Sequence, residues 1–338
     1  MNPKSRRTAR PGAGPVLLGI ILFVASAPPP ASTEERPDAR PPRFRVELYG
    51  GVGQPGLSDL NRFAAADEAV QEFGYDRLLD YQRQSGLISG WNKTLTGKRG
   101  TIGLAAPLGL RVRWRLSAPL SLSLGVRLSS ARRASEYSFA YARTDSYGYE
   151  DRETVAYDPY RLSSRFLAVL AGAHFAKPLF KRWSLEAFLA AGPVFADCEY
   201  ASAWVYTWHR RGPDQDWDVF EMAGSLEEKG RGTGLAADLG VRLERPLGRR
   251  LALFVEAAYG LQAVRTVKGS GREVRGGVVT EWEGTWAFKK ETIAAPWGAL
   301  ETETPSSFWP EGSAAARSRD FKLDASGFQA RIGFSFLF

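Results

Sequence analysis

The last twelve residues of the chain, Gly327 to Phe338, read GFQARIGFSFLF. Every second residue from Phe328 to Phe338 is apolar, and Gln329 and Arg331 stand between the first of them. Successive side chains of a β-strand point to opposite faces of a sheet. The alternation therefore predicts a strand with one apolar face and one polar face.

The same period of two recurs through the rest of the chain. In residues 102–116, apolar residues alternate with Arg111, Arg113 and Arg115. Counting such segments gives seven more strands, at residues 44–49, 102–116, 120–128, 162–176, 183–189, 235–244 and 251–262. We therefore predict an all-β chain of eight antiparallel strands, with ten strands as the alternative.

The connections between these strands alternate in length. Three are short and contain a Pro-Leu pair, at Pro119-Leu120, Pro178-Leu179 and Pro246-Leu247. Proline is tolerated in a turn because a turn residue need not donate to the β-ladder. The other connections are long, at residues 53–100, 131–160, 198–231 and 265–326. Short turns at one end and long loops at the other are typical of outer-membrane β-barrels.

Two of the long connections contain further structure by pattern. In the first, Ser58 or Asp59 could cap a short helix whose apolar residues fall on one face. In the fourth, residues 278–288 alternate imperfectly and indicate an extra hairpin.

Period two does not by itself separate a membrane barrel from a soluble barrel or β-sandwich, because turning the sheet inside out preserves it. Aromatic residues near strand ends favour the membrane, since they form girdles at both bilayer interfaces. Here Trp114, Phe175 and Trp183 stand beside short turns, and Tyr49 and Tyr259 stand toward the long connections. A transmembrane strand needs only about 9–11 residues. We therefore expect a transmembrane barrel over residues 44–338.

The N-terminus is typical of an export signal. Residues 1–27 contain Lys4, Arg6, Arg7 and Arg10, then an apolar stretch that ends in Ala25-Ser26-Ala27, a cleavage-site pattern. Cleavage after Ala31 is an alternative, since Pro28 follows the first site, and an uncleaved anchor is another. Residues 28–43 are rich in proline and charge and are predicted to form a disordered leader.

Composition excludes several classes of function. The net charge of +8 falls to about +4 without residues 1–27, and no basic run interleaves with aromatic residues, which argues against a nucleic-acid partner. One cysteine, Cys198, forms no disulfide within the chain, and two separated histidines do not make a zinc site. We expect no cofactor and no metal.

The final strand resembles the C-terminal assembly signal of bacterial outer-membrane proteins, and the eight-strand plan resembles small barrels of the outer membrane protein A, X and W type. The resemblance covers residues 44–338 in architecture and is specific in sequence only in the last strand. It implies that Phe334, Phe336 and Phe338 are read by the barrel-assembly machinery of a Gram-negative cell. It also implies outer-membrane lipids as partners and the outer membrane as the location.

The polar faces of the predicted strands are rich in charge. Eight strands enclose a space that side chains can just fill, so these residues are expected to form an ion-paired plug. The expected lumen network consists of Arg45, Glu47, Arg111, Arg113, Arg115, Arg127, Glu186, Asp238, Arg242, Glu244, Glu256 and Arg331. The alternative is a narrow pathway through the lumen that favours anions.

The long connections are rich in tryptophan. A candidate binding surface consists of Trp204, Trp208, Trp217, Trp282 and Trp286. The alternative is that these side chains pack the hairpins against one another. We therefore expect a non-enzymatic barrel with a structural or surface-binding role and an unknown extracellular ligand. A porin-like channel for small solutes is the alternative. A barrel enzyme that uses His209 is less favoured, because no matching set of acids accompanies this residue.

Overall fold

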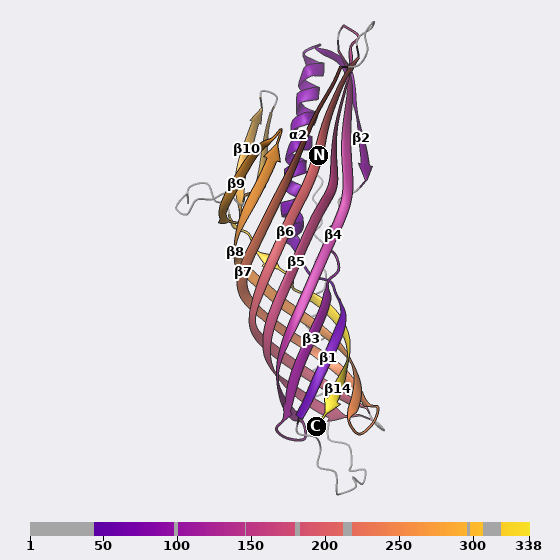
Figure 1. Ribbon diagram of the computed structural model, residues 1–338, viewed down its shortest axis with the longest axis vertical. Helices are drawn as coiled ribbons and strands as arrows, with labels where there is room; N and C mark the ends of the chain where they lie inside the picture. The colour runs from indigo at the N-terminus through magenta and orange to yellow at the C-terminus, as the bar shows by residue number, and fades with distance from the viewer. Residues whose placement is uncertain are drawn as a thin grey trace, which may run out of the picture.

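The computed structural model describes residues 44–97, 101–145, 147–179, 183–211, 218–295, 298–306 and 319–338. The molecule is elongated, with a barrel at one end and long strands that continue beyond it (Figure 1). None of the helices in these ranges is both long and apolar enough to cross a bilayer. Residues 1–43, which include the predicted signal peptide and leader, lie outside the described residues.

Eight antiparallel strands close the barrel, which confirms the predicted fold class and strand number. Their bounds are β1 (Phe44–Gly53), β3 (Ala106–Arg115), β4 (Leu120–Asp145), β5 (Glu150–Pro178), β6 (Ser184–Arg211), β7 (Asp218–Pro246), β8 (Leu251–Arg275) and β14 (Gly327–Leu337). Each pairs with the next in this order, and β14 returns to pair with β1. The ring leaves no free edge around the barrel itself.

Short turns join the strands at one end of the barrel, which we call the turn end. The backbone N–H groups of Leu179 and Leu247 donate to the carbonyl oxygens of Trp183 and Leu251, and both donors belong to the repeated Pro-Leu pairs. The N–H of Phe338 donates to the carbonyl oxygen of Phe44 at 3.0 Å. The first and last described residues therefore meet at the turn end, as an even number of strands requires.

Register places like side chains on like faces across the barrel. Leu48 of β1 lies opposite Leu110 of β3 on the outer face. On the inner face, a Cβ on Gly109 would fall 2.2 Å from the ring of Tyr49. A glycine is required there because the tyrosine ring lies across the lumen against the β3 backbone.

Beyond the barrel, β4 to β8 continue as one open sheet, which we call the extension. β2 (Ile88–Gly97) pairs with β4 at one edge, and β9 (Val278–Thr285) pairs with β8 at the other. The excursions predicted at residues 131–160 and 198–231 are therefore present, but they are largely strand rather than irregular loop. The hairpin expected at residues 278–288 is confirmed in β9.

Helix α2 (Ser58–Gln84) lies along the concave face of the extension (Figure 1). Leu79 packs on Ile88, Phe139 and Tyr141 of the sheet. The hydroxyl of Tyr141 donates to Asp76 Oδ1 at 2.8 Å. The helix is longer than predicted, and its C-terminal half packs on the sheet through Leu79.

The predicted N-cap of this helix was wrong. Leu57 occupies the N-cap position and provides no side-chain cap. The carboxylate of Asp59 instead accepts hydrogen bonds from the guanidinium of Arg319 at 2.7 and 3.1 Å and from the N–H of Lys322 at 3.1 Å. Asp59 therefore ties the start of the helix to the segment before the last strand.

A small second sheet stands beside the extension. It consists of β10 (Ala287–Ala295), β11 (Gly298–Ser306) and β12 (Arg319–Asp320). The short strand β13 (Leu323–Asp324) then pairs with β8 and leads the chain back into the barrel as β14.

Candidate functional site: the lumen and the outer wall

Glu47 is the centre of an ion-paired cluster inside the barrel near the turn end. Its carboxylate accepts from Arg111 Nε at 2.7 Å, Arg242 Nη1 at 2.8 Å and Arg113 Nη1 at 3.0 Å. Glu47 and Arg242 are fully buried. An ionised group can be held away from water only when it is paired and hydrogen-bonded in this way.

The cluster extends around the whole cross-section of the lumen. Further pairs join Arg113 to Glu186 at 2.9 Å, Arg45 to Glu244 at 2.5 Å, Arg331 to Asp238 at 2.6 Å, Arg331 to Glu256 at 3.5 Å, Arg111 to Glu256, Arg242 to Glu244, and Arg127 to Asp238. These residues come from β1, β3, β4, β6, β7, β8 and β14. The cluster therefore links nearly every wall of the barrel.

Aromatic rings pack against the guanidinium groups of the cluster. Arg242 lies 3.7 Å from the ring centroid of Phe254, and Arg111 lies 5.3 Å from that of Tyr49 and 5.6 Å from that of Phe188. Such contacts stabilise a desolvated arginine through the negative face of the ring. Sequence reasoning missed Phe188 and Phe254 because it assigned the polar strand faces to charge alone. Its assignment of Tyr49 to an aromatic girdle at the membrane interface was wrong, because the ring of Tyr49 is buried in the lumen.

Eleven of the twelve residues named for the lumen network meet in this cluster, and Arg115 does not. Its guanidinium donates to the carbonyl oxygens of Ser117 at 3.2 Å and Ala118 at 3.3 Å, outside the lumen at the turn end. Alternation correctly places Arg115 on the same strand face as Arg113. The strand ends there, however, so the side chain reaches the adjoining turn instead.

His174 lies at the edge of the cluster. Its Nε2 is 3.0 Å from Ser123 Oγ, its Nδ1 is 3.8 Å from Glu186 Oε2, and its ring stacks on Phe188. The histidine side chain is fully buried. Ser123, His174 and Glu186 thus lie next to one another in space. The buried histidine, however, has no exposed surface that a substrate could reach.

The half of the lumen farther from the turn end is apolar. Side chains from the barrel strands, from the start of α2 and from the segment before β14 form one buried cluster that begins there and continues along the inner face of the extension. Its largest members are Leu57, Leu60, Leu162, Phe166, Tyr200, Trp286, Phe288, Phe321 and Leu323. Sequence reasoning did not predict this second plug.

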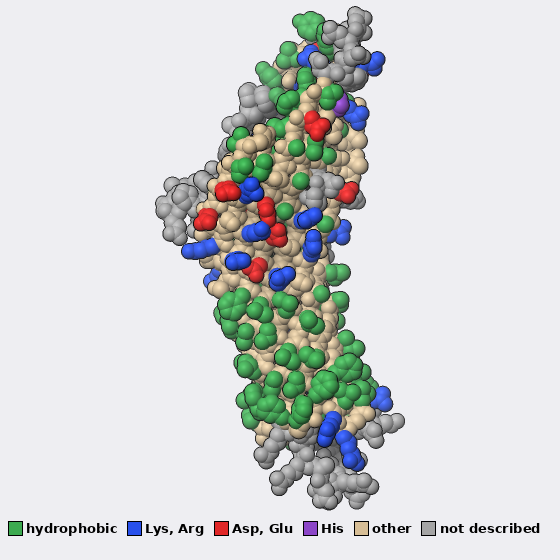
Figure 2. All heavy atoms as spheres, in the orientation of Figure 1, with side chains coloured by type: hydrophobic (Ala, Val, Ile, Leu, Met, Phe, Trp, Pro, Cys, Tyr) green, Lys and Arg blue, Asp and Glu red, His purple; other side chains and the backbone are tan. Residues whose placement is uncertain are grey.

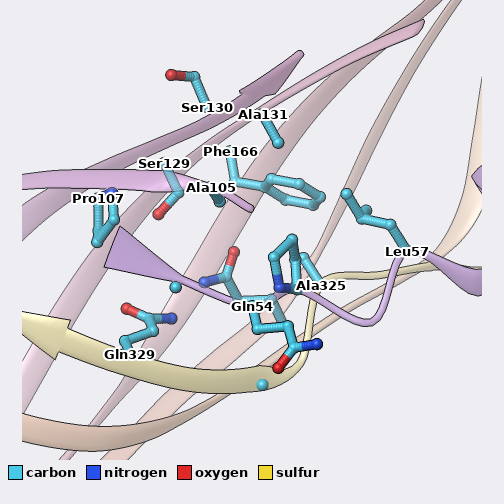
Figure 3. A pocket seen from close by; sticks show the side chains of 14 residues that line it. Gln54, Leu57, Ala105, Pro107, Ser129, Ser130, Ala131, Phe166, Ala325 and Gln329 are labelled. Atoms are coloured by element: carbon cyan, nitrogen blue, oxygen red, sulfur yellow. The ribbon is translucent and has the colours of Figure 1, made fainter. Parts of the chain in front are cut away.

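A small cavity lies where the charged and apolar halves meet. Its volume is about 20 Å³, which is room for about one water molecule. Figure 3 shows Gln54, Ser129 and Gln329 around it, with Phe166 and Leu57 on the apolar side. Ser129 Oγ has no protein hydrogen-bond partner. The cavity is too small for a solute larger than water.

The outer wall of the barrel is apolar between the turn end and the extension. Exposed side chains around the ring include Leu48, Leu108, Leu110, Leu122, Leu124, Val126, Leu128, Leu167, Leu189, Phe195, Leu235, Val255, Leu261, Ile332, Phe334 and Phe336. Figure 2 shows this hydrophobic band, with Lys, Arg, Asp and Glu side chains gathered directly above it.

The candidate tryptophan surface is not one surface. Trp286 is fully buried, with its ring 5.2 Å from that of Phe321, so its assignment to an exposed surface was wrong. Trp204, Trp208 and Trp282 are half-buried. Trp217 lies outside the described residues. Trp286 lines the inside of the extension because β9 and β10 fold its side chain back toward β8.

Among the described residues, no group of three or more His, Cys, Asp and Glu side chains has a geometry that could hold a metal ion. Fold and site together define an eight-stranded antiparallel barrel whose interior is charged at one end and apolar at the other.

Comparison with known proteins does not assign this fold to a particular family. Neither a family model nor a curated protein matches the chain. Among solved structures, the outer membrane protein OprG from Pseudomonas aeruginosa is similar at 11% sequence identity, over 88% of this chain and 97% of that chain, with a TM-score of 0.30. A TM-score this low transfers nothing from that protein. The barrel assignment rests on the strand pairing of this chain.

Proposed function

We propose that the protein is an integral outer-membrane β-barrel with a closed lumen and a structural or surface-binding role outside the cell. One observation carries the proposal: along the same strands, the apolar residues move from the outer face to the inner face and the polar residues move the other way. On β5, the outer face is apolar from Phe175 to Leu167 and polar from Arg165 to Arg161. The inner face changes in the opposite direction, from polar at His174 to apolar at Leu162.

A soluble barrel does not account for this exchange. In a soluble barrel the apolar face packs inside and the charged face meets water. In the half next to the short turns the order is reversed: Leu122 is 43% exposed and Phe334 is 45% exposed, whereas Arg113 is 2% exposed and Glu256 is fully buried. Apolar side chains around the whole circumference require a hydrocarbon surrounding, and a closed ring satisfies every backbone group there.

The apolar band also has the length of a bilayer span. On β4 it runs from Leu120 to Leu128, nine residues. A tilted transmembrane strand needs about 9–11 residues. The short turns are then periplasmic and the extension is extracellular, as in known barrels of this kind.

Closure of the lumen favours the structural role over the channel. A solute would have to part the charges around Glu47 and then pass the apolar cluster around Phe166. Opening either region leaves buried groups without partners, which is costly. We further propose that the protein is not an enzyme and that His209 has no catalytic role.

Biogenesis follows from the same proposal. Phe334, Phe336 and Phe338 point outward from β14 and are exposed, which suits recognition by the barrel-assembly machinery before insertion. Export through residues 1–27 predicts a mature N-terminus at Pro28. N-terminal sequencing of the protein from the cell envelope tests this prediction, and a protein that retains Met1 would contradict it.

Two measurements test the proposed function. The purified protein, refolded into vesicles, should migrate faster on a cold SDS gel than after boiling, and trypsin should leave the barrel intact. In planar bilayers the same sample should show no channel openings. Stable openings in the wild-type protein would overturn the closed lumen and support the channel. Failure to insert would overturn the membrane assignment itself.

A further inference from the structure

The strongest feature that the proposed function leaves unused is a basic hollow on the outer face of β4 to β7, directly above the apolar band. The hollow has a volume of about 560 Å³. Its outward-pointing lining consists of Ser130, Arg132, Arg161, Ser163, Arg165, Asp197, Glu199, Lys229 and Arg231. Five basic side chains and two acidic ones therefore meet there. Figure 2 shows basic and acidic side chains gathered above the hydrophobic band.

Three arginines of the hollow are cross-strand neighbours of one another. Arg132 on β4 lies opposite Ser163 on β5, so Arg161 and Arg165 are its two diagonal neighbours. Diagonal neighbours in an antiparallel pair lie about 7–8 Å apart. All three arginines are exposed. The serines between them are short and leave the space that forms the hollow.

None of these three charges has an ion-pair partner in the part of the chain that the structure describes. Within the described residues, no ion pair joins Arg132, Arg161 or Arg165 to a carboxylate of the chain. Asp197 lies opposite Arg165, but its carboxylate pairs with Arg231 at 3.1 Å on the other side. The nearby Lys229 pairs with Glu227 at 2.5 Å. Like charges held this close repel each other unless an anion lies between them.

The lower edge of the hollow, at Arg165, lies at the height of the headgroup layer of the bilayer. Arg165 is two residues above Leu167, the last outward apolar residue of β5. Two residues advance about 7 Å along a strand, and less along the membrane normal because barrel strands tilt. The headgroup layer occupies roughly the 5–8 Å beyond the hydrocarbon on each side.

We propose that this hollow binds the phosphate groups of an outer-leaflet lipid, with Arg132, Arg161 and Arg165 as its ligands. Arginine forks bind phosphate oxygens in a bidentate manner, and the apolar band below offers a surface for the acyl chains of the same molecule. Glu199 lies opposite Ser163 and repels the phosphate, so it weakens the site. The proposal rests on the membrane location proposed above.

The test compares lipid binding by matched variants of the full chain. The variant R132Q/R165Q removes two charges from the hollow. R249Q/R250Q removes two charges from an exposed periplasmic turn and serves as the control. The probes are bis-phosphorylated lipid A, the same lipid A after enzymatic removal of its phosphates, and inorganic phosphate. Native mass spectrometry of the detergent-solubilised protein measures the bound fraction.

Wild type and control should bind bis-phosphorylated lipid A alike. R132Q/R165Q should bind it at least about tenfold more weakly, because it loses two charge-assisted contacts to the phosphates. E199Q should bind it more tightly. Equal binding of the dephosphorylated lipid would show that acyl chains alone are recognised. Equal competition by inorganic phosphate would show a general anion site. Either result, or unchanged binding by R132Q/R165Q, overturns the proposal.

The same samples separate this proposal from the membrane assignment. If all variants insert into vesicles and show the cold-gel mobility shift while lipid A binding is unchanged, only the headgroup site fails. If the wild-type protein does not insert, the membrane assignment fails and the hollow is a solvated surface.

Discussion

Five strands, β4 to β8, run through both the barrel and the extension, yet their faces carry opposite chemistry in the two parts. In the barrel near the turn end, arginines and acids are inside and leucines are outside. In the extension, apolar residues such as Phe139 and Tyr141 are inside and charged residues such as Arg132 and Arg161 are outside. Side chains alternate between the inner and the outer face in both parts, so the backbone conformation of the strands need not change between them. Under the proposed membrane location, the outer face meets hydrocarbon in the barrel and water in the extension, and this accounts for the difference.

The two parts also use their ion pairs differently. Glu47 and Arg242 are fully buried in the barrel, whereas the pair between Asp197 and Arg231 on the extension is largely exposed to solvent. Removing one partner of a buried ion pair leaves an unpaired buried charge and destabilises the fold, whereas an exposed ion pair contributes little to stability. The predictions below test whether this contrast holds.

The largest effect is expected at Glu47. Replacing Glu47 with Ala leaves three arginines without their shared carboxylate and should lower the free energy of unfolding by about 3–5 kcal/mol. Urea titration in detergent micelles, followed by tryptophan fluorescence, measures this loss. D197A, in the exposed pair, is the control and should cost less than about 1 kcal/mol. Equal losses for the two variants would contradict the contrast.

A charge on the outer wall of the barrel should have the next largest effect. Leu124 lies at the middle of the apolar band on β4, so L124R should destabilise the inserted protein by about 2–4 kcal/mol. V219R makes the same kind of change at an exposed site on the extension and should cost at most about 0.5 kcal/mol. The measurement is the urea midpoint in lipid vesicles. A tolerated L124R would argue against hydrocarbon at this position.

The apolar plug predicts a smaller loss. Leu60 is fully buried where α2 enters the lumen. L60A should destabilise the protein by about 2–3 kcal/mol through lost burial and a cavity, since the helix start can partly settle into the space. It should also leave bilayer conductance at zero, because the charged cluster below still closes the lumen. Channel openings in L60A would show that the apolar plug alone closes the lumen.

The smallest effect concerns Cys198, on the inner face of the extension. Burial raises the pKa of this thiol above its ordinary value, and its Sγ lies 3.6 Å from the carbonyl oxygen of Gly230. The folded protein should therefore hold a protonated thiol that does not react with maleimide at pH 8. Denaturation should restore labelling, as mass spectrometry can show. Rapid labelling of the folded protein would place this face in water.

Alternation was enough to predict the barrel from the sequence. Eight strands, their order and the short turns follow from residues such as Leu108, Leu110 and Val112 on one face and Arg111 and Arg113 on the other. The charged members of the lumen cluster could be named for the same reason. Their partners could not, because partner choice depends on barrel shear and not on sequence spacing.

The extension was harder to predict because its outer face loses the apolar residues that mark a strand in a bilayer. On β5 the outward residues become polar at Arg165. The predicted strand ended at Leu162 and residues 131–160 were predicted as a long connection, although the strand continues to Glu150. Trp286 shows the same limit, since composition placed it in a loop, while packing on Phe321, which is distant in sequence, buries it.

The boundary between the two parts of β5 gives the most direct test of the account. Single cysteines placed at Arg161, Ser163, Arg165, Leu167, Val169 and Ala171 on a C198S background can be spin-labelled in vesicles, and their accessibility to oxygen and to a water-soluble nickel reagent compared. The account predicts nickel access at residues 161 to 165 and oxygen access from 167 onward. Nickel access at Val169 and Ala171 would contradict the membrane assignment.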